Sequence, residues 1–214
     1  MHLTNIEILG YIFSILSAIC GFPEAYKSYK TKTTTLNRSF ISLWGSGCLF
    51  MLVYVLQKTS IDIPLVINLG VNLFFVLIIS FYSVRLRSFI LILFITGFIL
   101  YSSIIASYPA NFTYVLGWMA GLLFALCGAP ELLNSIKLKH SDNVTGVFMW
   151  LWLSAEGLGL SYVILKYGLD YPLLINHGLN MLVLVGIIYY KYFPTRVGDM
   201  IHDIELESVE LIKK

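Results

Sequence analysis

Seven runs of predominantly apolar residues, separated by short polar connections, dominate the chain. A helix needs about 20 apolar residues to cross the roughly 30 Å hydrocarbon core of a bilayer. On that length, the pattern predicts transmembrane helices over residues 6–26, 40–56, 63–84, 89–107, 114–136, 147–165 and 171–192. Backbone polar groups in hydrocarbon must be paired within their own segment, so we expect an all-α integral membrane protein.

The charges between these runs follow a pattern. The first, third and fifth connections and the segment after the last run are basic, with Lys27, Lys30, Lys32, Arg38, Arg85, Arg87, Lys137, Lys139, Lys191 and Arg196. The second and sixth connections each pair a lysine with an aspartate, Lys58 with Asp62 and Lys166 with Asp170. Because basic loops accumulate in the cytosol, we expect the N-terminus outside and the C-terminus inside. A plasma or bacterial inner membrane is preferred over a lysosomal one, although the sequence alone leaves both open.

Composition supports the membrane interpretation and narrows the partners. Hydrophobic residues make up 58% of the chain and charged residues 12%, far from the balance of soluble proteins. The three cysteines fall inside apolar runs, where small core residues are expected rather than a disulfide framework. No nucleophile–base set, phosphate loop or metal-ligand spacing occurs, so we expect no enzyme, no metal and no cofactor. The expected partners are the lipid bilayer and a small-molecule solute, with no nucleic acid, and a homo-oligomer is left open.

The two halves of the chain share an ordered series of residues. Gly10, Cys20, Gly21, Pro23, Glu24, Ser28, Lys30 and Lys32 recur 107 residues later, and Trp44, Tyr54, Lys58, Asp62, Pro64, Asn68, Gly70 and Asn72 recur 108 residues later. Such matches indicate an internal duplication. An unmatched fourth helix would give both units the same orientation in the membrane. We therefore expect a three-helix repeat over residues 1–86, a linker helix over 87–112, a second repeat over 113–193 and a cytosolic tail over 194–214.

The repeated element reads CGFPEAYKSYKTK at residues 20–32 and CGAPELLNSIKLK at 127–139. With the asparagine-bearing third helix, DIPLVINLGVNLFFVLIISFYS at 62–83, it resembles the PQ-loop repeat of SWEET and SemiSWEET sugar transporters and of cystinosin-like lysosomal amino-acid exporters. The resemblance implies two parallel three-helix bundles that alternate access to a central pocket. The chain departs from the family pattern where glutamate replaces the glutamine, and the family's pocket tryptophan is expected to be replaced by Tyr54 and Tyr162.

Pro23 and Pro130 are the expected hinges of the two bundles. A proline inside a helix removes one hydrogen bond and bends the axis. The alternative is that each kink only shapes packing. The neighbouring Glu24 and Glu131 are expected at an inner gate, either as structural ion pairs or as titrating groups.

Glu156 falls near the middle of its predicted helix, with no other charge within a turn or two. Hydrocarbon disfavours the charged form of a carboxyl group, which makes Glu156 the candidate for proton coupling. The alternative is a protonated glutamate that hydrogen-bonds a neighbouring helix. The equivalent position of the first half is Cys48.

The third and seventh runs are expected to supply the substrate-binding residues. Asn68 and Asn72 lie four residues apart and share a helix face, as do Asn176 and Asn180. Amides suit a neutral or zwitterionic solute, although asparagine also links helices in membranes. The resemblance assigns the family's substrate position to Asn68 and Asn176 in one register and to Leu69 and His177 in the other. His177 is thus a further candidate for solute binding or proton relay.

Aromatic side chains are the remaining pocket candidates. Tyr54 and Tyr162 are expected among the solute-binding residues, and with Trp44 and Trp152 they could stack on a ring of the solute. Near helix ends, Trp and Tyr also anchor helices at the membrane interface. The function expected from these features is an alternating-access transporter of a sugar first, or an amino acid next, with proton coupling open. A receptor or scaffold of the same fold is the alternative.

Overall fold

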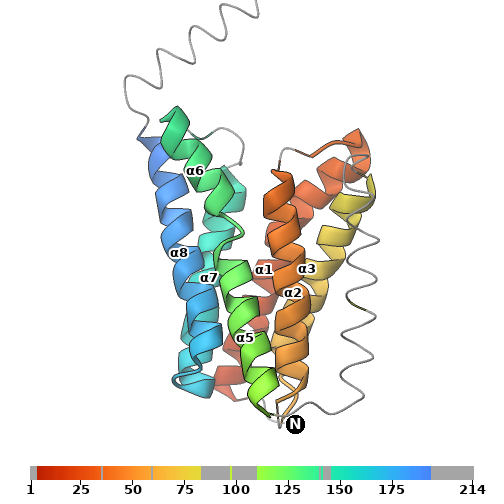
Figure 1. Ribbon diagram of the computed structural model, residues 1–214, viewed down its shortest axis with the longest axis vertical. Helices are drawn as coiled ribbons and strands as arrows, with labels where there is room; N and C mark the ends of the chain where they lie inside the picture. The colour runs from red at the N-terminus through yellow and green to blue at the C-terminus, as the bar shows by residue number, and fades with distance from the viewer. Residues whose placement is uncertain are drawn as a thin grey trace, which may run out of the picture.

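The computed structural model describes residues 4–34, 36–58, 60–82, 97, 110–139, 141 and 146–193, and these form an all-helical protein (Figure 1). The helices are α1 (Asn5–Thr31), α2 (Arg38–Leu56), α3 (Ile63–Tyr82), α5 (Ala110–Ala125), α6 (Ala129–Leu138), α7 (Gly146–Tyr167) and α8 (Tyr171–Tyr192). By length and composition, six stretches within the described ranges can cross a membrane, with α5 and α6 together counting as one. The predicted helix over 89–107 and the tail over 194–214 lie outside the described residues, apart from residue 97.

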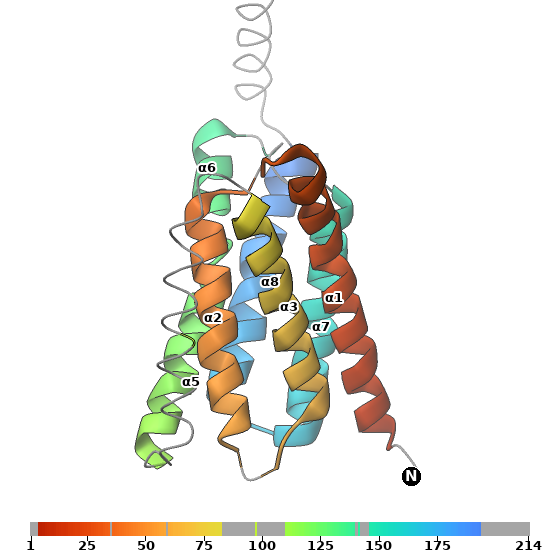
Figure 2. The ribbon, with the colours of Figure 1, turned by 90° about the vertical axis from the view of Figure 1, so that its right-hand side faces the viewer.

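The described spans form a first half of α1, α2 and α3 and a second half of α5 with α6, α7 and α8, which pack against each other (Figures 1 and 2). In the first half, α3 packs against α1 and α2, and in the second half α8 packs against α5, α6 and α7. The halves meet where α1 packs on α7 and α2 packs on α5. Figure 2 shows α1, α2 and α3 in front of α7 and α8. The surface between the halves is therefore built mainly by the first two spans of each.

The outward faces of the helices are apolar. On α1, Ile8, Ile12, Ile15 and Ile19 are all exposed and recur every three or four residues, along one side of the helix. A soluble monomer rarely exposes such a continuous apolar stripe, whereas a membrane helix presents it to lipid. With the six membrane-capable stretches, this identifies a multi-pass membrane protein.

The two proline motifs adopt different local structures. Pro23 lies inside the continuous helix α1, as a kink requires. Pro130 instead lies in the first turn of α6, after a break at residues 126–128. There the carbonyl four residues before the proline, that of Leu126, accepts a hydrogen bond from the N–H of Ala129 at 3.1 Å. The prediction of a proline inside a helix was therefore wrong for Pro130, because the chain leaves the helix before it reaches the proline.

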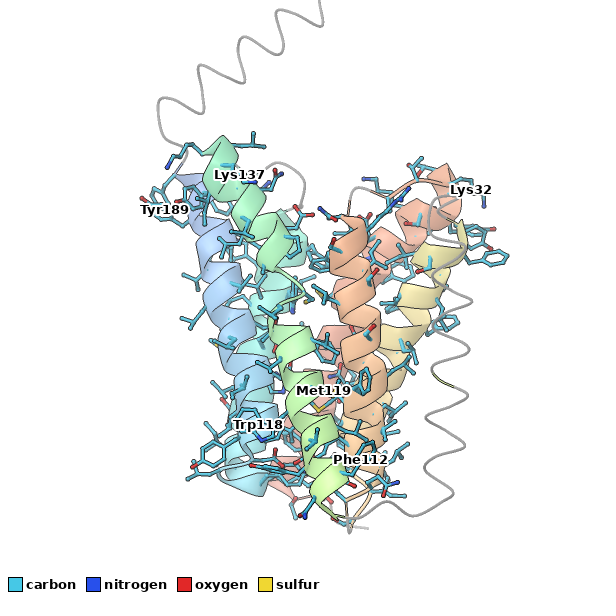
Figure 3. The ribbon with its side chains drawn as sticks, viewed as in Figure 1. Lys32, Phe112, Trp118, Met119, Lys137 and Tyr189 are labelled. Atoms are coloured by element: carbon cyan, nitrogen blue, oxygen red, sulfur yellow. The ribbon has the colours of Figure 1, made fainter. Side chains whose placement is uncertain are left out.

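The molecule has two chemically distinct ends. Lys32 and Lys137 lie at one end, which we call the basic end (Figure 3). Lys32 and Lys139, which occupy equivalent positions of the two halves, both end their helices in the left-handed conformation. The turns from α2 to α3 and from α7 to α8 lie at the other end, which we call the aspartate end after Asp62 and Asp170.

Candidate functional site

A cavity of about 40 Å³, lined by polar and apolar side chains, lies between the two halves. Every described helix except α6 contributes to its lining, which consists of Phe13, Ser17, Cys20, Phe40, Trp44, Asn68, Leu69, Asn72, Phe124, Phe148, Trp152, Glu156, Asn176 and His177. A space of this size holds a few water molecules. A larger solute therefore needs the halves to move apart.

Three of the four predicted asparagines line the cavity. On α3, Nδ2 of Asn72 donates to Oδ1 of Asn68 at 2.8 Å and to Oγ of Ser17 at 3.0 Å. On α8, Nδ2 of Asn180 donates to Oδ1 of Asn176 at 3.3 Å. Asn180 lies behind the lining and turns its amide to Glu156. Both family registers reach the cavity, because Asn68 and Asn176 line it together with Leu69 and His177.

Glu156 of α7 lies against the cavity and is bound by side chains of two helices. Its Oε2 lies 2.6 Å from Nδ1 of His177, and its Oε1 accepts hydrogen bonds from Nε1 of Trp152 at 2.8 Å and Nδ2 of Asn180 at 3.2 Å. The sequence nominated Glu156 and His177 separately and did not predict that they pair. No group of three His, Cys, Asp or Glu side chains that could hold a metal ion occurs within the described ranges.

Four aromatic side chains at equivalent positions of the halves form another part of the lining. The ring of Phe40 lies edge-on to Trp152 at 5.4 Å and to Trp44 at 5.8 Å, and Phe148 packs on Trp152 at 5.5 Å. The two tryptophans thus line the cavity and do not anchor the helix ends. The sequence contained a signal for this role, since both pairs recur at the 108-residue spacing.

Tyr54 and Tyr162, which were expected in the pocket, do not belong to its lining. Each instead reaches across to the other half at the aspartate end. The hydroxyl of Tyr162 donates to both carboxylate oxygens of Asp62, at 2.8 and 2.9 Å, and that of Tyr54 donates to Asp170, at 3.0 and 3.2 Å. Both tyrosines lie in the helical turn nearest the aspartate end, closer to that end than the asparagines that line the cavity. This position explains why they do not line it.

The contacts at the aspartate end are reciprocal. Lys166 pairs with Asp62 at 3.0 Å, and at the equivalent positions Lys58 pairs with Asp170. Tyr167 joins the two sets, because its hydroxyl donates to Asp62 while the ammonium of Lys58 lies 3.8 Å from the centre of its ring. We call these residues the aspartate-end network; they are Tyr54, Lys58, Asp62, Tyr162, Lys166, Tyr167 and Asp170.

Glycine makes room for the network in each half. A Cβ atom on Gly10 of α1 would lie 2.6 Å from the ring of Tyr162, and one on Gly117 of α5 would lie 2.7 Å from the ring of Tyr54. Real Cβ atoms do not approach other atoms so closely. The two glycines recognised in the repeat therefore admit the tyrosine of the opposite half.

The electrostatics of Asp62 keep it charged. Burial alone would raise its pKa, but the hydroxyls of Tyr167 and Tyr162, the N–H of Leu65 and the ammonium of Lys166 outweigh burial, and the pKa lies below its ordinary value. Hydrogen bonds to the charged form have this effect. The network is therefore held by a carboxylate rather than by a carboxylic acid.

At the basic end, the predicted gate residues make different contacts. Oε1 of the buried Glu131 accepts a hydrogen bond from the backbone N–H of Asn37 at 3.2 Å, so α6 of the second half touches the start of α2. Glu24 accepts one from the hydroxyl of Thr34 at 2.7 Å, within the first half. The hydrogen bond of Glu131 thus links the two halves at this end.

Comparison with known proteins places the fold. No protein-family model matches the chain. An uncharacterised protein of the archaeon Methanocaldococcus jannaschii is 31% identical over 77 residues, which are 36% of this chain and 81% of that protein. That relative is therefore less than half as long as this chain. A eukaryotic SWEET transporter, solved at 3.7 Å resolution, has a similar structure with a TM-score of 0.61 at 15% identity, over 87% of this chain and 99% of that one.

Proposed function

The chain belongs to the family of the uncharacterised M. jannaschii protein and has the fold of a SWEET transporter, and we propose that it transports a small neutral or zwitterionic solute by alternating access. The observation that carries the proposal is a cavity containing amide, carboxyl and imidazole side chains, which lies between two halves that are joined at the aspartate end by reciprocal contacts. A binding site between two similar halves is the common design of secondary transporters.

The network suits a closure that has to open. Its contacts are ion pairs and hydrogen bonds among hydroxyl, ammonium and carboxylate groups, which water solvates well when they separate. Breaking a buried ion pair is costly when one charge stays buried without its partner. Parting of the halves would expose both partners of each pair to water, so neither charge is left buried alone. Water can therefore replace these contacts as the halves part, whereas an apolar closure would expose hydrocarbon.

The same proposal includes the architecture and the topology. Two PQ-loop-like repeats, over residues 1–86 and 113–193, are joined by a linker helix over 87–112 and followed by a tail over 194–214, giving seven spans with the N-terminus outside. The ordered repetition along the sequence and the half-length relative support it. The basic end would then face the cytosol and the aspartate end the outside.

For the solute, we propose that the amides of Asn68, Asn72 and Asn176 supply hydrogen bonds. Amides both donate and accept, so they serve the hydroxyls of a sugar or the polar groups of an amino acid. Sugar is placed first because the solved transporter of this fold is a SWEET. Glu156 is the residue proposed to carry a proton if transport is coupled.

Uptake into proteoliposomes tests this function. Labelled glucose, sucrose, alanine and uridine would be offered to wild type and to Asn176→Ala, with Ser161→Ala as control, because the Ser161 hydroxyl bonds only its own helix, at Gly157, among the described residues. We expect saturable uptake of at least one solute, with a loss of about tenfold or more in Asn176→Ala, as removal of one or two buried hydrogen bonds implies. If no solute enters with wild type, or if Asn176→Ala and Ser161→Ala behave alike, the cavity is not the transport site, and a receptor of this fold gains support.

A further inference from the structure

The pair formed by Glu156 and His177 breaks the similarity of the two halves. The equivalent positions of the first half are Cys48 and Leu69. At other equivalent positions, the same residue lines the cavity in both halves; these pairs are Asn68 and Asn176, Trp44 and Trp152, and Phe40 and Phe148. The acid and the imidazole therefore add chemical groups that the symmetric part of the lining does not provide.

The pair is buried, and one nitrogen of its imidazole ring has no hydrogen-bond partner among the described residues. The His177 side chain is 4% exposed, and the ring stands edge-on to Phe13 at a centroid distance of 5.5 Å. Its Nδ1 faces Glu156, while its Nε2 has no hydrogen-bond partner within the described residues. A buried ring nitrogen without a partner is costly. Since His177 lines the cavity, a solute that enters can supply the missing partner.

The protonation state of the pair sets what Nε2 can bind. In the deprotonated pair, a carboxylate of Glu156 faces Nδ1 of His177. Nδ1 must then carry the hydrogen, because two bare acceptors 2.6 Å apart repel each other. Nε2 is therefore a bare acceptor in this state. When the pair gains a proton, either an imidazolium faces a carboxylate or a neutral imidazole faces a carboxylic acid. In both forms Nε2 carries a hydrogen. The added proton belongs to the pair, and it turns Nε2 from an acceptor into a donor.

We propose that the Glu156–His177 pair binds one proton together with the solute, and that the protonated pair uses Nε2 of His177 to donate a hydrogen bond to a carbonyl or carboxylate oxygen of that solute. The proposal rests on the proposed transport function and specifies its solute class and its coupling. A solute with a carboxylate meets a neutral, donating pair after protonation and an anionic, accepting pair before it. A hydroxyl group, which both donates and accepts, can bind either state.

The surroundings of the pair support a proton-dependent site. On α7 and α8, Trp152 and Asn180 hold the other carboxylate oxygen as positioning residues. Besides His177, the thiols of Cys20 on α1 and Cys127 beside α6 interact with Glu156. Among the described residues, no lysine or arginine lines the cavity to neutralise Glu156 in its place.

Nitrogen-15 NMR of histidine-labelled protein in nanodiscs tests the first part, with His177→Gln used to assign the signal. From high to low pH, we expect Nε2 of His177 to change from a bare nitrogen to an N–H, because the proton that the pair gains leaves a hydrogen on this nitrogen. Saturating alanine should move this change to higher pH, since linkage makes proton and solute favour one another. Glucose should leave it in place. An Nε2 signal that keeps one form throughout would overturn the inference, whatever is transported.

Uptake in proteoliposomes tests the second part. We expect alanine uptake to be about tenfold faster at about pH 5.5 than at about pH 7.5, with glucose uptake changing less than about twofold. Glu156→Gln and His177→Gln should remove the pH dependence, whereas Cys48→Ala, at the position equivalent to Glu156, should retain it. Equal pH dependence in Glu156→Gln and wild type would contradict the coupling and leave the transport function standing. Absence of all uptake, with the alanine-induced NMR shift retained, would refute transport and support proton-linked binding.

Discussion

Replacing Asp62 with asparagine should open the aspartate end. The Asp62 side chain is fully buried and holds Tyr162, Tyr167 and Lys166 of the opposite half. It also caps α3, since it accepts the N–H of Leu65 at 3.1 Å. Asparagine keeps the size and caps helices equally well. The substitution removes the charge and replaces the oxygen that faces Tyr167 and Lys166 with an amide NH2, which cannot accept their hydrogen bonds.

The expected magnitude follows from the hydrogen bonds and the ion pair that the substitution weakens. A hydrogen bond to a charged group contributes about 1.5–3 kcal/mol, and one between neutral groups about 0.5–1.5 kcal/mol. The two tyrosine hydroxyls would thus lose about 1 kcal/mol each. Lys166 is partly exposed, so water screens its pair with Asp62, and its loss adds about 0–1 kcal/mol. A total of about 2–3 kcal/mol shifts the balance between closed and open aspartate ends by about 30- to 150-fold.

Distances between spin labels across this end measure the shift. The labels would be attached at Ile61→Cys and Leu169→Cys, which are 65% and 74% exposed at equivalent positions of the halves, after replacement of the three native cysteines by alanine. We expect Asp62→Asn to increase the fraction of long distances, and Asp170→Asn to act in the same direction. Ser161→Ala serves as control. Distance distributions identical to wild type in both asparagine variants would refute the network as a closure.

Two further predictions use the same labels. The folded-state pKa of Asp62 is depressed, so the contribution of its carboxylate to closure is fully present above the ordinary aspartate pKa of about 3.9 and is lost only as pH falls below that value. The distances should therefore stay constant from about pH 8 to about pH 5. A change within that range would contradict the role assigned to Asp62. Gly10→Ala should lengthen the distances, because its Cβ would displace the Tyr162 ring at a cost of about 1–3 kcal/mol. Gly70→Ala should leave them unchanged, because its Cβ would meet no atom of another described helix within 4 Å.

Much of the helical layout could be predicted from local pattern. The last helix begins and ends where the apolar run does, at Tyr171 and Tyr192, because the length of an apolar run is a property of contiguous residues. The proline motifs show the limit. CGFPE continues as helix and CGAPE is broken before its proline, although the two differ at one position. The two motifs also differ in the side chains that pack around them, and a five-residue sequence does not specify those neighbours.

The candidate site divides in the same way. Spacing alone indicated that Asn68 and Asn72 share a face, since residues four apart on a helix do. Spacing could not predict the hydrogen bond from Tyr162 to Asp62, because 100 residues separate the two along the chain. The 108-residue repetition contains both tyrosines and both aspartates, so it could have nominated the two sets, but not their exchange between halves.

By itself, the sequence determined the apolar spans, the ordered repetition and the residues able to carry charge or hydrogen bonds within the membrane. These depend on the transfer of side chains to hydrocarbon and on the period of the helix, both of which act over a few neighbouring residues. Only the tertiary structure decided that Glu156 meets His177, that the tryptophans rather than the tyrosines line the cavity, and that each aspartate binds the opposite half. Those pairings arise from how the two halves dock, because residues distant in sequence become neighbours only when whole helices pack.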